Sequence, residues 1–301
     1  MKPEISICII TYNQENYIRK AIKGALAQHI DVPYEIVISD DCSTDSTQEL
    51  CLEYQEKYPN TIRVVRQPVN LGVGKHWVSA INECSGKYVS LCEGDDYFID
   101  PFKIKKQYEF MRDNPQYSLC SHEVYVDHEL ASRSFRGAVG IWLDNIQLSG
   151  LQVIPSMSFW ALFQKDVFWK RRRMYRGHKR YRTASFEQIL ISQLEGRYIH
   201  TVSMFTKAEV LKRFPPALLE SAGFHRASIV WLALNGRVRH DACVMGMRVI
   251  QSDSSAITKR EKKLSEMGPR VAGTKREFVN SILPYCTDSQ RRMIEERDFG
   301  E

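Results

Sequence analysis

Three carboxylates are crowded into four consecutive positions of the sequence, directly after an apolar stretch. The residues "YVSLC" (88–92) suit a buried strand, and Glu93, Asp95 and Asp96 follow them. Crowding acids is unfavourable unless a cation neutralises them, because like charges repel at short range. Glu93 and Asp95 lie two positions apart and can hold a hard divalent cation that also bridges phosphates. An acidic turn before a helix is the alternative interpretation.

Two further polar clusters follow apolar stretches in the same way. They read "TYNQEN" (11–16) and "SDDCSTDST" (39–47). In the second cluster, Asp40 or Asp41 can accept hydrogen bonds from a base or a ribose. The alternative is structural, because aspartates also form turns and cap helices.

The apolar stretches alternate with helical patterns in the first part of the chain. Strands are predicted at residues 5–12, 34–39, 61–67 and 87–92, and helices at about 17–26, 44–57 and 77–81. Strands that are apolar on both faces and alternate with helices indicate a parallel sheet covered on both sides. In such a sheet, ligands bind at the carboxyl ends of the strands, and all three polar clusters fall there. The predicted fold class is therefore α/β, with a Rossmann-like, mostly parallel sheet.

The alternation weakens in the second half of the chain. Asp100 followed by Pro101 predicts the start of a helix, and residues 117–127 predict another strand. Later elements are predicted as helices near 186–195, 207–213 and 227–235, and as strands near 198–204 and 243–250. We therefore expect a core domain over 1–127 and a second region with a helical C-terminal part over 128–301.

Composition narrows the class of protein. Hydrophobic residues make up 43% of the 301 residues, enough for a substantial core. No apolar run reaches the roughly 18 residues that span a bilayer, and no signal peptide is recognisable, so a cytoplasmic location is expected. The eight cysteines are scattered without metal-binding spacing, which favours reduced core thiols.

The net charge of +6 comes from one segment. Eight basic residues and no acid lie between Val167 and Phe186, and the rest of the chain is nearly neutral. With the aromatic residues before it, the segment 158–182 is typical of an anchor for an anionic membrane face, which would make the protein peripheral on the inner membrane. A basic helix face that packs against the core is the alternative. No nucleic-acid-binding module is recognisable, and no nucleic-acid partner is expected.

Four stretches together closely resemble the family 2 glycosyltransferases, which are inverting enzymes with the GT-A fold that use nucleotide-diphosphate sugars. They are "SICIITYNQENYIRKAI" (6–22), "YEIVISDDCSTDST" (34–47), "NLGVGKHW" (70–77) and "LCEGDDYF" (91–98). The resemblance is dense over 4–127 and weak from about 129 to 183. It returns loosely over 185–214, which is similar to the family's acceptor-side segment and implies that 128–301 is an acceptor-side region. It implies a glycosyltransferase that moves a sugar, in particular from a UDP-sugar, to a glycan or lipid-linked acceptor in bacterial surface polysaccharide synthesis.

The resemblance also implies roles for individual residues. Thr11, Tyr12, Asn13 and Glu15 match the motif that cradles the nucleotide, Asp40 and Asp41 match the pair that reads the uracil or ribose, and Glu93, Gly94 and Asp95 match the metal-binding motif. The implied cofactor is Mn²⁺ or Mg²⁺, held by Asp95 with Glu93. Lys75 is placed near the phosphates or the donor sugar, with a solvated helix start as the alternative.

The catalytic base departs from the family pattern. An inverting displacement needs a group that deprotonates the acceptor, and His225 stands where the family has an acid. A later family histidine is matched by Gln251. His225 or Glu220 is therefore the candidate base, and a structural histidine at a helix start is the alternative.

Two other function classes compete with the glycosyltransferase. A nucleotidyltransferase would need a glycine-rich loop with Lys or Arg after the first strand, and "TYNQEN" has neither. A non-catalytic nucleotide-sugar binder or partner subunit is motivated by the missing acid. The sequence does not indicate the donor sugar, the acceptor, the linkage or the oligomeric state.

Overall fold

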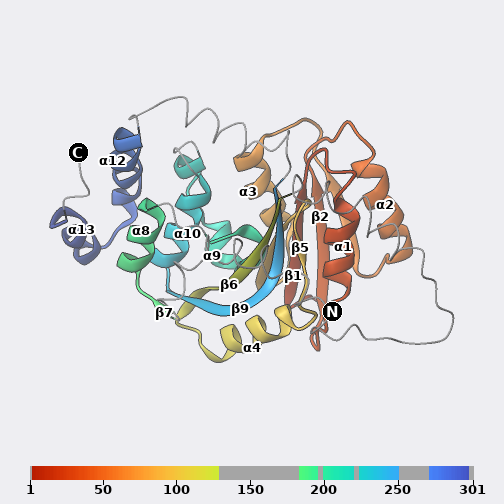
Figure 1. Cartoon of the computed structure of the whole chain (residues 1–301), viewed down its shortest axis with the longest axis horizontal. Coiled ribbons are helices and arrows are strands. Elements are labelled where there is room, and N and C mark those ends of the chain that lie inside the picture. Colours follow the sequence, from red (N-terminus) through yellow and green to blue (C-terminus); the bar gives the residue numbers. More distant parts are fainter. Residues whose placement is uncertain (1, 129–182, 196–198, 220–223, 251–270, 298–301) are drawn as a thin grey trace. The chain divides into compact units, whose positions relative to one another are not determined.

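The computed structural model describes residues 2–128, 183–195, 199–219, 224–250 and 271–297 (Figure 1). Compact units are residues 1–124 with 178–248 and 268–301, and residues 125–177 with 249–267. The sheet core and the site described below belong to the first unit, and most of the second lies outside the described residues. The expected division into 1–127 and 128–301 concerns the functions of the two regions rather than their compactness, and it stays a prediction.

Four parallel strands form the first part of the sheet. In spatial order they are β3 (Ile62–Arg66), β2 (Tyr34–Asp40), β1 (Ile5–Thr11) and β4 (Tyr88–Glu93). The β-branched residues that dominate β1 and β2 are buried on both faces of the sheet, as the continuous apolar pattern predicts. Because β1 lies between β2 and β4, the carboxyl ends of these three strands meet at one edge.

Helices cover both faces of the parallel strands (Figure 1). The helices are α1 (Ile18–Leu26) and α2 (Thr47–Lys57), which pack with α4 (Lys103–Asp113) on one face, and α3 (Val73–Glu83) on the other. In α1 the buried residues Ile18, Ala21, Ile22 and Ala25 recur at helical spacing and face the sheet. The predicted α/β fold is confirmed.

Antiparallel strands extend the sheet beyond β4. They are β8 (Phe205–Lys207), β6 (Tyr117–His128), β9 (Arg237–Ile250) and the two-residue β5 (Tyr97–Phe98), with β7 (Thr183–Ala184) paired to β9. Strand β8 pairs with β4 on one side and with β6 on the other, so it joins the antiparallel strands to the parallel part of the sheet.

Short helices complete the described part of the chain. They are α8 (Phe186–Leu194), η2 (Thr201–Ser203), α9 (Ala208–Lys212), η3 (Pro216–Leu219), α10 (Phe224–Leu234), α12 (Val271–Ile282), η5 (Leu283–Tyr285) and α13 (Asp288–Glu295). Several of them pack with α3 in one hydrophobic cluster. No helix in the described ranges is long and apolar enough to cross a bilayer.

One predicted element is wrong, and another begins a few residues later than expected. Residues 198–204 were expected as a strand, but residues 201–203 form η2, because the N–H and hydroxyl of Ser203 both donate to the carbonyl of His200 and close a turn. The helix expected to open at Asp100 and Pro101 has its first helical residue at Lys103, and the Asp100 carboxylate accepts from the N–H of Phe102 at 2.8 Å, as an aspartate before a helix does.

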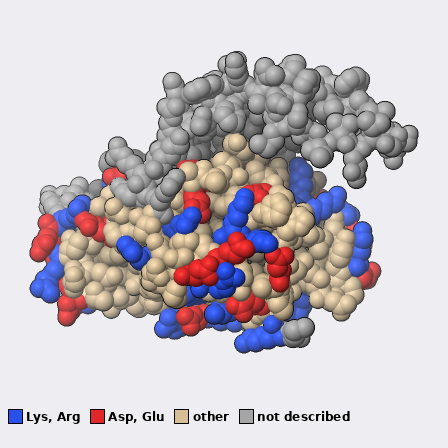
Figure 2. All heavy atoms as spheres, turned by 90° about the horizontal axis from the view of Figure 1, so that it is seen from below, with Lys and Arg blue, Asp and Glu red and all other residues tan. Residues whose placement is uncertain are grey.

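The charged surface is mixed where it is described. Figure 2 shows Lys and Arg interspersed with Asp and Glu over the described part of one face. Pairs such as Lys106–Asp100, 2.7 Å apart, neutralise each other locally. The basic segment 158–182, on which the membrane prediction depends, lies outside the described residues.

Candidate functional site

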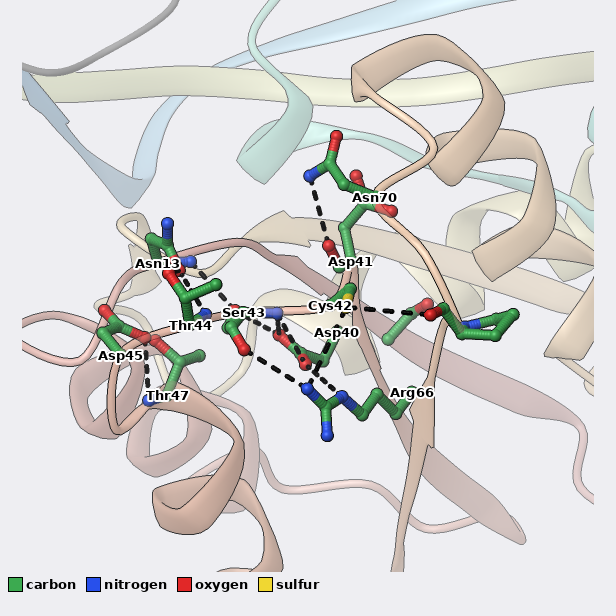
Figure 3. Close-up of polar contacts among 12 residues, drawn as sticks. Asn13, Asp40, Asp41, Cys42, Ser43, Thr44, Asp45, Thr47, Arg66 and Asn70 are labelled. Atoms are coloured by element: carbon green, nitrogen blue, oxygen red, sulfur yellow. Dashed lines mark hydrogen bonds and ion pairs between the residues drawn. The ribbon is translucent and has the colours of Figure 1, made fainter.

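Two loops at the carboxyl edge of the sheet are fastened to each other. They are the loop between β1 and α1 and the loop between β2 and α2 (Figure 3). The N–H of Asn13 donates to Oγ of Ser43 at 2.9 Å, and Oδ1 of Asn13 accepts from the N–H of Thr44 at 2.8 Å. The N–H of Gln14 donates to Oγ1 of Thr47 at 2.7 Å. Side chains of each loop thus satisfy the backbone of the other, and the two loops form one rigid surface.

Two residues in these loops have positive φ. Asn13 has φ of 51° and Cys42 has φ of 62°. Asparagine tolerates this region, but cysteine adopts it only where surrounding bonds hold it there. Such bonds flank Cys42, because Asp41 donates its N–H to the carbonyl of Thr11 at 3.0 Å. This hydrogen bond therefore helps to hold the sharp turn after β2 in its conformation.

Asp40 is fully buried and serves this turn. Its carboxylate accepts from the N–H of Ser43 at 3.1 Å and from the Ser43 hydroxyl. Nε of Arg66 lies 3.9 Å from its Oδ2 (Figure 3). The structural alternative considered for Asp40 thus has direct support, and its contact with a base or ribose stays a prediction.

Asp41 connects the turn to a third loop. Its carboxylate accepts from the N–H groups of Leu71 at 2.8 Å and Gly72 at 3.0 Å, and its carbonyl accepts from the side chain of Asn70. Gly72 has φ of 75°, a conformation that suits glycine, and directly precedes α3. Lys75 is exposed in the first turn of α3. Because Asp41 holds the two residues that precede α3, it helps to position the helix that carries Lys75.

A buried histidine lies below the aspartate pair. Nε2 of His76 lies 2.8 Å from the hydroxyl of Ser39, the residue before Asp40. Burial lowers the pKa of His76, and the negative charges of Asp41 and Asp40 partly oppose that shift. We therefore assign the neutral form to His76 at pH 7, as a hydrogen-bonding support of α3 against β2.

Two further predicted nucleotide residues lie at the outer side of the fastened loops. Glu15 accepts from the N–H of Ser46 at 2.9 Å and donates its own N–H to Asp45 at 3.2 Å. Tyr12 is 45% exposed, although it directly follows a buried strand. Its ring is accessible to a ligand at the edge of the sheet.

The acidic turn lies beside the first loop. The N–H of Asp96 donates to the carbonyl of Glu93 at 2.9 Å and closes the turn, and the N–H of Gly94 donates to the carbonyl of Ile10 at 2.9 Å. A Cβ on Gly94 would lie 2.6 Å from Oγ1 of Thr11, so only glycine fits this close approach. Thr11 therefore touches both the turn that carries Asp95 and the loop that carries Asn13.

A segment from the second half of the chain reaches the same turn. The hydroxyl of Thr201 donates to Oε1 of Glu93 at 3.1 Å. Two residues earlier, the carbonyl of Ile199 accepts from Nε2 of His225 at 2.9 Å. Burial lowers the pKa of His225, and the charge of Glu93 partly opposes that shift. His225 thus lies within the electrostatic reach of the acidic turn, whereas Glu220, the other candidate base, lies outside the described residues.

The donor atoms of the acidic turn suit a hard divalent cation. Glu93 and Asp95 offer carboxylate oxygens and are only partly buried, so a cation could retain water and phosphate ligands. Among the described residues, no group of three or more His, Cys, Asp or Glu is placed to hold a metal by itself. Water and the oxygens of a diphosphate are ligands that can complete the coordination of a cation held by two carboxylates.

Sequence reasoning located the three polar clusters but missed several residues that hold them. Ser43, Thr44 and Thr47 were visible as a hydroxyl-rich run, and that density was the available signal for loop-to-loop bonding. Thr201 gave no local signal, because it lies 108 positions from Glu93.

Fold and site together define a class of protein, namely an α/β protein whose parallel sheet carries three polar clusters, one of them an acidic turn, at its carboxyl edge. The sequence model described as "Glycosyl transferase family 2" matches residues 6–189, and the chain belongs to that family.

Curated relatives match less than half of the chain. An uncharacterized protein of Mycobacterium tuberculosis is 41% identical over 125 residues, which are 42% of this chain and 36% of that protein. The putative teichuronic acid biosynthesis glycosyltransferase TuaG of Bacillus subtilis is 34% identical over 110 residues, 36% of this chain and 42% of TuaG. The chain thus spans less than half the length of these relatives.

Solved structures share the fold over nearly the whole chain. TarS of S. aureus, residues 1–349 in complex with UDP-GlcNAc, has a TM-score of 0.55 at 18% identity and covers 95% of this chain and 74% of that one. The mannosyltransferase PcManGT of Pyrobaculum calidifontis, in complex with GDP-Man and Mn²⁺, has a TM-score of 0.56 at 14% identity, with coverage of 98% and 79%. The likeness confirms the GT-A fold.

Proposed function

We propose that this chain transfers a sugar from a nucleotide-diphosphate sugar, with UDP as the nucleotide, to a glycan or lipid-linked acceptor in bacterial surface polysaccharide synthesis. The observation that carries the proposal is the meeting of the Thr11–Asn13 loop, the Asp40–Asp41 turn and the Glu93–Asp95 turn at one edge of the sheet. Family membership and the names of TuaG and of a Bacillus spizizenii poly(ribitol-phosphate) beta-glucosyltransferase, 32% identical over 112 residues, support the substrate class.

The fastened loops form the nucleotide side of the proposed site. Tyr12 offers an exposed ring to a base, while Asn13 lies at the positive-φ position that shapes the loop. Asp41 holds the loop before α3 in place and so sets the position of Lys75 near the phosphates. UDP and UDP-GlcNAc are ligands of TarS, which supports this donor class.

Asp95 and Glu93 form the phosphate side. They are proposed to hold Mn²⁺ or Mg²⁺, which would neutralise the diphosphate as a leaving group. Mn²⁺ accompanies GDP-Man in PcManGT, which supports a divalent cofactor. The close approach of Gly94 to Thr11 fixes the turn between the two carboxylates and keeps them beside the nucleotide loop.

The proposed reaction is a single inverting displacement. The acceptor hydroxyl gives its proton to a base, its oxygen bonds to the anomeric carbon, and the bond from that carbon to the diphosphate breaks. Because Nε2 of His225 donates to a carbonyl, the neutral ring keeps its lone pair on Nδ1, and that atom can accept the proton. Burial, which lowers the pKa of His225, favours this neutral form at pH 7.

A panel of nucleotide sugars tests the proposal, each with Mn²⁺, Mg²⁺ or EDTA, scored by thermal shift and by release of nucleotide diphosphate. We expect UDP and a UDP-sugar to raise the melting temperature only with the metal, because binding to the native state stabilises it by mass action. Asp95→Ala should remove the metal dependence. Equal shifts of wild type and Asp95→Ala would refute the metal assignment, and metal-dependent binding with no turnover on any acceptor would favour the non-catalytic binder.

A further inference from the structure

A lysine is completely buried beside β4, the apolar strand that ends at Glu93. Lys103 is 0% exposed, and its Nζ donates to Oγ of Ser90 at 2.9 Å and to Oε1 of Gln107 at 2.8 Å. The same Nζ lies 4.3 Å from the centre of the Phe98 ring. Burying an amine costs free energy, so three specific contacts around it indicate a defined structural task.

The contacts of Gln107 give that task a direction. Its Nε2 donates to the carbonyls of Cys120 at 3.0 Å and Ser203 at 2.9 Å. Carbonyls only accept, so the amide can be oriented in one way, with Oε1 facing Lys103. Oε1 then accepts from Lys103, which helps to keep Gln107 in this position, and Gln107 in turn holds Ser203.

Ser203 is the last residue of a short segment, 199–203, that contacts both the acidic turn and the candidate base. The segment 199–203 includes Thr201, whose hydroxyl donates to Glu93, and Ile199, whose carbonyl accepts from His225. Ser203 donates both its N–H and its hydroxyl to the carbonyl of His200 between them. A shift of Ser203 would therefore move the partners of the acidic turn and of the candidate base together.

We propose that Lys103 and Gln107 are positioning residues that hold the segment 199–203 and thereby set the geometry of Glu93 and His225. This inference rests on the proposed function only for its effect on catalysis. The positions of Glu93 and His225 can be tested without turnover.

The surroundings of Lys103 change its affinity for a proton but not its two hydrogen bonds. The titratable groups that face it are Cys92 on β4 and Cys120 and His122 on β6. Burial lowers the pKa of Lys103 to about 7, and the two cysteines oppose that shift. Either charge state supplies the two N–H groups that Ser90 and Gln107 need. The charged form is also attracted by the electron-rich face of Phe98, whose ring centre lies 4.3 Å from Nζ.

Gln28 provides a matched control for Gln107. It is also a buried glutamine that contacts α4, donates to two carbonyls, those of Asp100 and Gly24, and accepts from one donor, the N–H of Ile104. Gln107→Met and Gln28→Met each remove three hydrogen bonds at nearly constant side-chain length. Of these two glutamines, only Gln107 contacts the segment 199–203.

The test records the imidazole NMR signals of ¹³C-labelled histidine in the ligand-free protein, together with the affinity for UDP in the presence of Mn²⁺. In Gln107→Met we expect the His225 signals to move and the UDP affinity to fall about tenfold, the effect of losing one good hydrogen bond. Gln28→Met should lower the melting temperature and leave both readouts as in wild type. Unmoved His225 signals in folded Gln107→Met, or equal movement in both variants, would overturn the proposal.

Lys103→Met gives a second test of the same arrangement, because at nearly constant side-chain length it removes the N–H groups that donate to Ser90 and Gln107. We expect the His225 signals of folded Lys103→Met to move as they do in Gln107→Met. Unmoved signals would also overturn the proposal. If wild type binds no nucleotide with metal, the proposed function fails, while the NMR readouts still decide the positioning role.

Discussion

The hydroxyl of Thr201 donates a hydrogen bond of 3.1 Å to Oε1 of Glu93, and so joins the second half of the chain to the end of β4. Glu93 lies in the turn proposed to hold the metal, and Thr201 belongs to η2. One side-chain bond therefore links the donor side of the site to the segment that also contacts His225.

Replacement of Thr201 by valine should weaken metal-dependent UDP binding. Thr201→Val keeps the shape of the side chain but removes the donor, so Glu93 loses the bond that orients it. Hydrogen bonds to charged groups contribute about 1.5–3 kcal/mol, so we expect about a tenfold or greater loss of affinity by calorimetry. Thr206→Val, which removes a buried hydroxyl bonded to Ser118 at 2.7 Å, is the control and should cost stability alone. Equal affinities of Thr201→Val and wild type would rule out this role.

Loss of the Asp41 carboxylate should release the loop before α3. In Asp41→Ala, the N–H groups of Leu71 and Gly72 lose their acceptors, and we expect both amides to exchange with deuterium faster than in wild type. UDP affinity should fall with them. Asp100→Ala removes the same kind of bond, to the N–H of Phe102, at a different place and should leave Leu71 and Gly72 unchanged. Unaltered exchange in Asp41→Ala would show that other contacts hold the loop.

Sequence reasoning succeeded where the signal was local. The strands β1, β2 and β4 were recognisable because their apolar residues are contiguous and end in polar clusters, and the parallel topology then placed those clusters at one edge. The turn at Gly94 was recognisable from the acids that flank it. These features depend on residues within a few positions of one another.

The contacts that the sequence did not reveal join distant positions. A run such as "IHTVSMF" (199–205) has the composition of a strand, yet Thr201 within it bonds to Glu93, 108 positions away. Lys103 has the sequence context of an exposed lysine beside Lys105 and Lys106, but tertiary packing buries it. Burial and long-range pairing override local pattern at these sites, so only the folded structure shows them.

Lys103 should make the stability of the protein depend on pH between about 7 and 10. Its pKa is about 7 in the folded state and about 10.4 in an unfolded chain, so the unfolded state binds more protons in this range. The free energy of unfolding should therefore rise with pH here, and Lys103→Met should have a flatter profile in urea titrations. Lys106→Met, at an exposed lysine paired with Asp100, is the control and should keep the wild-type slope. Equal slopes for wild type and Lys103→Met would contradict the buried, shifted amine.

Glu35 should make the fold sensitive to acid at the opposite edge of the sheet. Burial raises the pKa of Glu35, but hydrogen bonds from Ser6 and Ser85 and the charge of Arg63 outweigh it, so the pKa is lowered. The ionised form then stabilises the fold above about pH 4.3, and this contribution is lost as the pH falls through the lower folded pKa. The difference in unfolding free energy between wild type and Glu35→Gln should shrink from pH 7 to pH 3. A constant difference would contradict the shift, and Glu83→Gln, an exposed partner of Arg63, should show almost none.

The candidate base gives the most direct test of catalysis. Burial lowers the pKa of His225, with Glu93 partly opposing, so the group should ionise below its usual value of about 6.5. Only the neutral ring accepts a proton, and the rate of sugar transfer or donor hydrolysis should therefore rise with pH on a limb below 6.5 and level off by pH 7. His225→Ala should lower turnover by about 10²-fold or more, the usual contribution of general-base catalysis, and should spare donor affinity.

A second substitution separates the base from a structural histidine. His225→Gln can still donate to the carbonyl of Ile199 through its amide, but it carries no group that titrates near neutral pH. If His225 is the base, His225→Gln is as inactive as His225→Ala and the limb below pH 6.5 disappears. If the ring only holds the segment 199–203 in place, His225→Gln restores turnover with an unchanged pH profile, and Glu220 becomes the residue to replace. Because the hydrogen bond to Ile199 is kept in one variant and lost in the other, the two outcomes cannot be confused.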